Sequence, residues 1–284
     1  MEVISISSHL RNLAFLSWPD ASKAALKEGS TIVWPFGACE QHGPQLPLIT
    51  DTYFAESVLF EVFERLPAEL PIWSLPPQTI GFSPEHLGFP GTLSLSGSLM
   101  MEIVSEIGKQ LANMGFQRLV LFNAHGGQIG LLQAIARELR IQCPSMAVLP
   151  CFLWSGVEEL KDLIPNREVE QGLHAALAET SLMLSFDPEL VGDLRPCDGD
   201  YKISSNPSMK VPLGWSLEGA APCAWLTNEL SQSGVIGDSR GSNSKLGDDL
   251  RKVLVEHWFE LFSNLLKSKW PPVENSRKLN TNNS

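Results

Sequence analysis

The strongest structural signal in this chain is a repeated order of a short apolar run, a glycine-containing loop and a stretch with apolar residues at helical spacing. Strands are predicted at 31–36, 118–123 and 146–152, and helices at 51–65, 97–114, 128–140, 170–186 and 244–266. Alternating strands and helices favour an α/β fold in which helices cover both faces of a mostly parallel sheet.

Composition narrows the class of protein. The 284 residues include 21 Lys and Arg against 32 Asp and Glu, so the formal net charge is −11. Nucleic acid is not an expected partner, because phosphate binding needs a clustered basic surface. Apolar residues make up 43% of the chain, which is enough for a sizeable core. We expect one domain over 1–270 and a disordered tail over 271–284.

The sequence contains no membrane signal and no disulfide pattern. No run approaches the ~20 apolar residues that a membrane span requires, and the N-terminus lacks the pattern of a signal peptide. We therefore expect a cytoplasmic protein without membrane contact. The five cysteines form no C-x-x-C pair, which argues against a disulfide framework and a thiolate zinc site.

A first cluster of polar residues follows the strand predicted at 31–36. Glu40 and His42 are two positions apart, so in extended backbone both side chains face the same way. Asp51 stands where a helix should begin and could be its N-cap, and His42 alone could be an ordinary core histidine. Together, two carboxylates and an imidazole within twelve residues indicate a site for a divalent metal ion.

A second cluster follows the strand predicted at 118–123. Ligands of open α/β sheets bind beyond the carboxyl ends of the strands, so His125 could share one site with the first cluster. Gly126 and Gly127 would let backbone N–H groups approach a substrate oxygen closely. Alternatively, these glycines only form a tight turn between strand and helix.

A third cluster contains His174 and Glu179. In a regular helix these side chains would point ~140° apart, so either the helix begins after His174 or one of the two lies outside the site. A glutamate among Ala, Leu and Met needs a cation or a hydrogen-bond donor nearby. Residues 187–242 show no periodic pattern and could form an active-site cover, a subunit contact or an ordinary insertion.

At these residues the chain resembles the creatininase (creatinine amidohydrolase) family. The likeness lies in four segments, 34–51, 85–92, 123–127 and 174–184. The resemblance implies a three-layer α/β/α sandwich and a homo-oligomer, such as a hexamer. It also implies a site with two divalent metal ions (Zn, Mn or Fe) that hydrolyses carbon–nitrogen bonds other than ordinary peptide bonds.

The resemblance also assigns roles to residues. Glu40 and His125 would bind one metal ion, His42 would bind the other, Asp51 would bridge them, and His174 would act in proton transfer. Creatininase itself has Tyr-Glu after the histidine that matches His125, and that glutamate binds the second metal ion. Here Gly126 and Gly127 stand in that place, so we take Glu179 as the replacement ligand and do not expect creatinine as substrate.

These assignments predict a metal-dependent amidohydrolase that acts on a cyclic amide, a formamide or a similar small molecule. Ser83, His86, Gly126 and Gly127 would contact the substrate, and His174 would protonate the leaving nitrogen. Two alternatives stay open. A non-catalytic relative that binds a metal ion or small molecule would have one metal ion and a blocked pocket, and a peptide-trimming member would need an open groove for a chain end.

Overall fold

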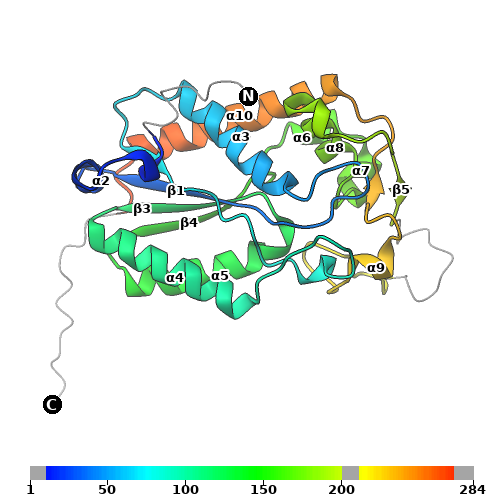
Figure 1. Cartoon of the computed structure of the whole chain (residues 1–284), viewed down its shortest axis with the longest axis horizontal. Helices are drawn as coiled ribbons and strands as arrows, with labels where there is room; N and C mark the ends of the chain where they lie inside the picture. The colour runs from blue at the N-terminus through cyan, green and yellow to red at the C-terminus, as the bar shows by residue number, and fades with distance from the viewer. Residues whose placement is uncertain (1–10, 200–210, 272–284) are drawn as a thin grey trace, which may run out of the picture.

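A central parallel sheet organises the chain in the computed structural model, which describes residues 11–199 and 211–271. Its four strands lie in the order β2-β1-β3-β4 (Figure 1). Their bounds are β1 Thr31–Phe36, β2 Ile72–Ser74, β3 Arg118–Asn123 and β4 Ala147–Phe152. The strands predicted from sequence are thus confirmed, and β2 is an additional strand in a proline-rich segment where no pattern indicated one.

Helices cover both faces of this sheet, as Figure 1 shows. One face packs against α3 (Thr50–Arg65), α8 (Leu177–Phe186) and α10 (Ser244–Lys267), and the other against α4 (Gly97–Met114) and α5 (Ile129–Gln142). Side chains alternate between the two cores: Val33 and Val120 belong to the first, whereas Ile32 and Leu119 belong to the second. This arrangement is the expected three-layer α/β/α sandwich.

Short elements connect these layers. They are η1 (Leu13–Phe15), α2 (Trp18–Ala25), η2 (Pro84–His86), η3 (Gly126–Gln128), α6 (Leu160–Leu163), α7 (Asn166–Gln171), η4 (Pro188–Leu190) and α9 (Thr227–Leu230). Strands β5 (Cys197–Asp198) and β6 (Gly237–Asp238) form a small antiparallel pair.

The helix predicted over 170–186 is wrong in its first part. Helix α7 ends at Gln171 and α8 begins at Leu177, so the residues between them form a loop. Two backbone hydrogen bonds tie His174 to Ile236 in this loop. Ala175 follows with φ 51°, a left-handed conformation that a regular helix cannot contain. The sequence left open whether the helix begins after His174 or whether one of the two side chains lies outside the site. The structure shows that the helix begins after His174.

The register of the strands places their carboxyl ends together. Phe36 pairs with Asn123 and Asn123 pairs with Phe152 at the last position of each strand. The loops that follow β1 and β3 therefore leave the sheet at the same edge, which is where both sequence clusters lie.

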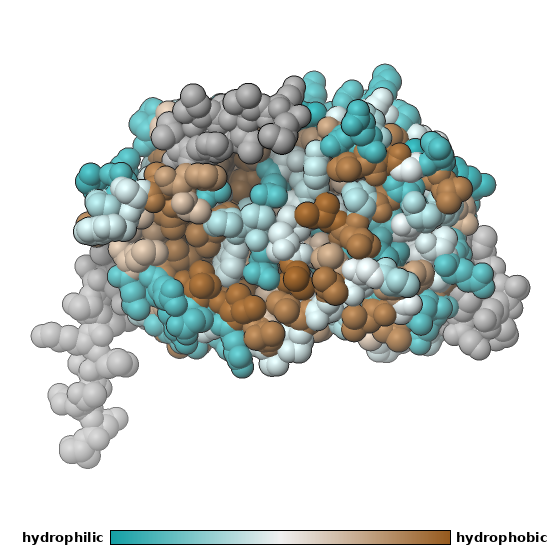
Figure 2. All heavy atoms as spheres, viewed as in Figure 1, coloured by the Kyte–Doolittle hydropathy of each residue, from teal (hydrophilic) through white to brown (hydrophobic). Residues whose placement is uncertain are grey.

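The surface and the cysteines complete the description. Figure 2 shows apolar residues on one face in patches separated by polar ones. Within the described residues, no helix has the length and apolarity needed to span a membrane. All five cysteines are free thiols. The predicted tail, 271–284, lies outside the described residues except for its first residue.

Candidate metal centre

The loop after β1 brings Glu40 and His42 to the carboxyl edge of the sheet, and both side chains are buried. The Glu40 backbone N–H donates to the Leu48 carbonyl, which folds the loop back on itself. After β3, Asn123 holds the next residues in place, because its side chain accepts from the His125 backbone N–H at 3.0 Å. The two clusters predicted from sequence therefore meet at one point.

Glu40, Asp51 and His125 form a first group of ligand atoms. His125 Nδ1 lies 3.2 Å from Glu40 Oε1 and 3.3 Å from Asp51 Oδ2. Ser83 Oγ donates a hydrogen bond to Glu40 Oε2 and so keeps Oε1 directed toward this group. The observed contact of Ser83 is therefore with a candidate ligand, Glu40. Ser83 does not line the cavity, and its predicted contact with the substrate stays a prediction.

His42, Asp51 and Glu179 form a second group. His42 Nε2 lies 3.3 Å from Asp51 Oδ1. Glu179 sits in the first turn of α8, where its Oε2 accepts a hydrogen bond of 2.5 Å from the Ala175 backbone N–H. Asp51 belongs to both groups, as a bridging ligand would. It makes no cap hydrogen bond, because the N-cap of α3 is Ile49.

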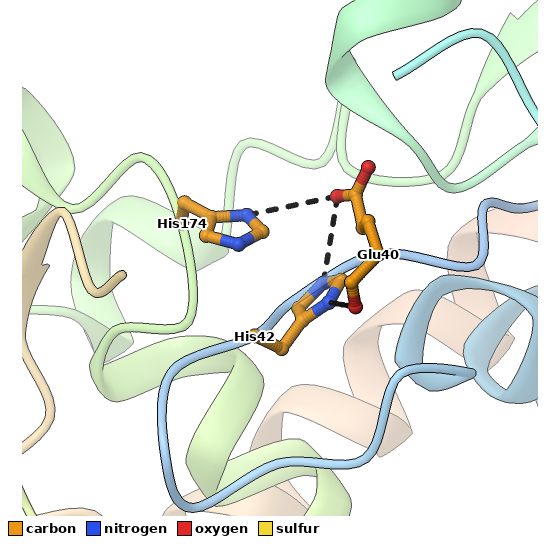
Figure 3. A group of neighbouring side chains, drawn as sticks. All are labelled: Glu40, His42 and His174. Carbon is orange, nitrogen blue, oxygen red and sulfur yellow. Dashed lines mark hydrogen bonds and ion pairs between the residues drawn. The ribbon is translucent and has the colours of Figure 1, made fainter. Parts of the chain in front are cut away.

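His174 comes close to the same centre from the loop before α8. Its Nδ1 lies 3.8 Å from Glu40 Oε1, and its ring centroid lies 4.3 Å from that of His42. In Figure 3, the imidazoles of His42 and His174 both point toward the same carboxylate oxygen of Glu40. Glu40, His42 and His174 thus make a third possible group of ligand atoms.

Two buried atoms at this centre, His42 Nε2 and Asp51 Oδ2, have no hydrogen-bond partner among the residues that the structure describes. Buried polar atoms are nearly always hydrogen-bonded, so such a pair needs an explanation. A divalent cation would accept a lone pair from each atom and remove the cost of leaving both unpaired. The donor set of imidazoles and carboxylates suits Zn, Mn or Fe.

The protonation of three histidines is fixed by backbone carbonyls. His42 Nδ1 lies 3.2 Å from Glu40 O, His125 Nε2 lies 3.0 Å from Phe82 O, and His174 Nε2 lies 2.7 Å from Gln41 O. A carbonyl only accepts, so each of these nitrogens carries a proton. The opposite nitrogen of each neutral ring then presents a lone pair to the centre, which is the usual arrangement for metal-binding histidines.

Burial and nearby charges raise the pKa values of His42 and Glu179 and lower that of His174. Burial alone would lower the pKa of His42, but the carboxylates around it, Asp51 above all, together outweigh burial and raise the pKa to about 9. Burial raises the pKa of Glu179 to about 7. Burial, followed by repulsion from His86 and His42, lowers the pKa of His174 well below its ordinary value. His174 is therefore a neutral proton acceptor in the metal-free protein.

A cavity of about 1040 Å³ lies in front of the ligand groups. Its wall includes several predicted site residues, Glu40, Asp51, His86, His125, Gly126, Gly127, His174 and Glu179. Trp154 and Trp225 add apolar surface, and Glu218 adds a carboxylate. Residues 217–218 and 222–226 belong to the segment without a sequence pattern, so part of that segment covers the site.

Gly127 is required by close packing. A Cβ at this position would collide with the Glu85 carboxylate and would lie 2.7 Å from His125 Nε2. At Gly126 a Cβ would meet only Glu218 Oε1, at 3.9 Å. Of the two predicted glycines, only Gly127 is thus constrained by its surroundings.

Sequence reasoning missed several side chains at the site. Gln41, which lies between Glu40 and His42 in the sequence, contacts His86. Thr227 also contacts His86, and Glu85 lies 3.5 Å from His125. Thr227 had no local signal, because it lies in the segment without periodicity.

Comparison with known proteins shows which family this sequence matches. The family model described as creatinine amidohydrolase matches residues 14–262. The chain is 32% identical over 253 residues to the mycofactocin precursor peptide peptidase of Mycolicibacterium smegmatis, covering 88% of this chain and 92% of that protein. It is 30% identical over 190 residues to the creatinine amidohydrolase of Pseudomonas putida, covering 62% of this chain and 72% of that protein.

Solved structures share the fold. The structure described as "Creatininase Mn" superposes with a TM-score of 0.70 at 23% identity, covering 91% of this chain and 99% of the other. The match of the family model extends over most of this sequence, including all three clusters of polar residues. The chain belongs to the creatininase family.

Proposed function

We propose that the protein is a metal-dependent hydrolase that cleaves an amide C–N bond at the end of a peptide. The observation that carries this proposal is the cavity of about 1040 Å³ in front of two groups of ligand atoms. This volume lies at the upper end of the roughly 300–1,000 Å³ of small-molecule pockets, and it leaves room for several residues of a chain end. The similarity to a peptidase over 88% of the chain supports the same substrate class.

The first group, Glu40, Asp51 and His125, would hold one divalent ion, and His42, Asp51 and Glu179 would hold a second. Two such ions lower the pKa of a water molecule and polarise the carbonyl of the bond to be cleaved. Zn, Mn and Fe all suit these ligands. Manganese is named for one solved structure of the same fold.

His174 is placed to move the proton. Its Nε2 proton is held by the Gln41 carbonyl, so Nδ1 is the atom that accepts a proton from the attacking water. The same atom then gives the proton to the leaving nitrogen, which cannot depart as an anion. Its depressed pKa keeps Nδ1 unprotonated before the reaction.

A second candidate is hydrolysis of a small cyclic amide or a formamide. The similarity to a creatinine amidohydrolase favours it, as does the likeness of residues 34–51 and 174–184 noted from the sequence. Gly126 and Gly127 stand in the place of Tyr-Glu, which argues against creatinine itself. A non-catalytic relative would have a blocked pocket, whereas here the ligand groups face an open cavity.

The substrate class can be tested with protein reconstituted separately with zinc, manganese and iron. The panel contains short peptides with free or blocked ends, formamides and cyclic amides, and release of amine is measured. We expect turnover of peptides with loss of one or a few terminal residues. Turnover of formamides or cyclic amides alone would overturn the peptide assignment in favour of the second candidate. No turnover with any metal would overturn both.

A further inference from the structure

His86 differs from the other histidines at the site. It is 2% exposed, and it approaches the first ligand group through Nε2, which lies 3.5 Å from Glu40 Oε1. Its other nitrogen, Nδ1, faces two side chains, those of Gln41 and Thr227, and no backbone carbonyl. Its protonation therefore depends on how the Gln41 amide is oriented.

The orientation of the Gln41 amide is fixed by two backbone groups. The Gly43 N–H donates to Gln41 Oε1 at 2.9 Å, so this atom must be the oxygen. Gln41 Nε2 donates to the Gly234 carbonyl at 3.0 Å, so this atom must carry the hydrogens. If the amide were flipped, its N–H group would face the Gly43 N–H and its oxygen would face the Gly234 carbonyl, so neither hydrogen bond could form.

The second amide hydrogen of Gln41 then points toward His86 Nδ1, which lies 2.9 Å from Gln41 Nε2. An N–H group needs a lone pair as its acceptor, so Nδ1 is unprotonated and the ring proton of neutral His86 lies on Nε2. Because Nδ1 has a single lone pair, the Thr227 hydroxyl, 2.7 Å away, shares it with the Gln41 N–H as a second donor. In their neutral forms, His42, His125 and His174 thus present lone pairs to the centre, whereas His86 presents a hydrogen.

We infer that Gln41 locks the proton of His86 onto Nε2, so that His86 donates a hydrogen bond to the carbonyl oxygen of the amide being cleaved. The donor lies 3.5 Å from Glu40 Oε1, which itself lies 3.2 Å from His125 Nδ1. His86 and Glu40 both line the cavity, so this donor faces the space that the substrate would enter. Such a donor acts most strongly as negative charge develops on that oxygen.

The inference rests on the proposed amide hydrolysis and adds two roles to it. His86 is a catalytic residue, and it differs from a ligand because its lone pair faces away from the centre. Gln41 is a positioning residue, because it acts only through His86. Packing supports the arrangement: the His86 ring lies 4.1 Å from that of His174 and meets the edge of Trp225 at 82°.

The tautomer can be observed without any substrate. Zinc-loaded protein with ¹⁵N-labelled histidine is studied by two-bond ¹H–¹⁵N NMR, and the His86 signals are assigned as those missing in His86→Gln. We expect a protonated Nε2 and an unprotonated Nδ1 in the wild-type protein. In Gln41→Glu the carboxylate only accepts, so the proton should appear on Nδ1. A proton on Nδ1 of the wild-type protein would overturn the inference.

Kinetics with the preferred amide substrate test the catalytic role. Gln41→Glu and His86→Phe should lower kcat by about 100-fold, with KM changed less than threefold and with metal content unchanged. The kcat of His86→Gln should be at least tenfold higher than that of His86→Phe, because the amide N–H of glutamine reaches the position of Nε2. Gln78→Glu is the matched control, since Gln78 donates to the Ile80 carbonyl and contacts none of these residues.

The outcomes separate this inference from the proposed function. Wild-type protein without amide hydrolysis would overturn the proposed function and the catalytic role of His86 together, while the NMR experiment still decides the tautomer. Hydrolysis that proceeds at the wild-type rate in Gln41→Glu and His86→Phe would overturn the role of His86 alone. Equal losses in His86→Phe and His86→Gln would show that His86 acts only by packing.

Discussion

His42 Nε2 and Asp51 Oδ1 face each other across 3.3 Å in a fully buried position. His42 Nε2 makes no hydrogen bond within the described residues, and the other Asp51 oxygen, Oδ2, makes none either. Asp51 lies between the two ligand groups and belongs to both. This arrangement makes Asp51 the residue on which both metal positions depend.

Asp51→Ala should therefore abolish metal binding and activity together. The substitution removes one ligand from each group and leaves His42 without its carboxylate. Elemental analysis of the purified protein measures the metal, and amide turnover measures the activity. Asp249→Ala, which changes an exposed aspartate near Lys245, is the control and should retain both. Full metal content in Asp51→Ala would exclude the bridging role.

His174→Asn should keep its metal and lose turnover. Removing the proton acceptor Nδ1 should lower kcat by about 10²- to 10⁴-fold, the usual range for acid–base residues. The experiment compares kcat and metal content in the same preparation. Because His174 also belongs to a group of possible ligands, loss of metal would instead identify it as a ligand.

Metal affinity should rise with pH. The pKa of His42 is raised from 6.5 to about 9 because the attraction of the surrounding carboxylates, Asp51 above all, outweighs burial, so the metal-free protein carries this proton at neutral pH. Binding must displace the proton, and affinity should rise about tenfold per pH unit until about pH 9. In the metal-free protein the same shift stabilises the fold below pH 6.5, and that contribution is lost as the pH rises through 9.

Calorimetric titration with Mn²⁺ in two buffers of different ionisation enthalpy counts the released protons. His42→Gln should release about one proton fewer than the wild-type protein, because its side chain does not titrate. An affinity that stays constant between pH 6.5 and 8.5 would contradict this assignment.

Gly127→Ala and Gly126→Ala should differ sharply. An added Cβ at 127 collides with Glu85 and presses on His125, whereas at 126 the nearest atom is 3.9 Å away. We expect Gly127→Ala to weaken metal binding by about 10- to 100-fold, as displaced supports of a ligand do. Metal titration of both variants checks this. Equal affinities would mean that the loop moves without disturbing His125.

Ala175→Gly should stabilise the protein. Ala175 has φ 51°, where an alanine side chain crowds its own backbone, and glycine relieves about 1–2 kcal/mol of that cost. The greater freedom of glycine in the unfolded chain offsets part of the gain, so the free energy of unfolding should rise by about 1 kcal/mol. Urea denaturation of the metal-free protein measures it, and a clear loss of stability would show that Ala175 is not strained.

Much of the fold was predictable because its signals are local. Strands β1, β3 and β4 and helices α3, α4, α5 and α10 follow from short apolar patterns. Glu40, His42 and Asp51 are neighbours along the chain, so one loop suffices to bring them together. His125 could be added because parallel strands end at a common edge of the sheet.

Other features depended on contacts between distant segments. The loop that carries His174 is set by its pairing with Ile236, which no nearby residue could indicate. Strand β2 is short and lies in a proline-rich segment, and it is held by backbone pairing with β1 and with Asn12, which its own sequence does not indicate. Part of the cavity wall comes from residues 217–226, where periodicity is absent.

The sequence by itself indicated which side chains could bind a metal ion and at which edge of the sheet they gather, because the alternation of strand and loop and the spacing of the ligands are local patterns. Only the tertiary structure decided which nitrogen of each histidine faces the centre. That choice for His86 rests on the Gln41 amide, which the Gly234 carbonyl holds from 193 positions away along the chain. The hydrogen-bond partner of each ring nitrogen decides which nitrogen carries the proton, and folding brings that partner into place.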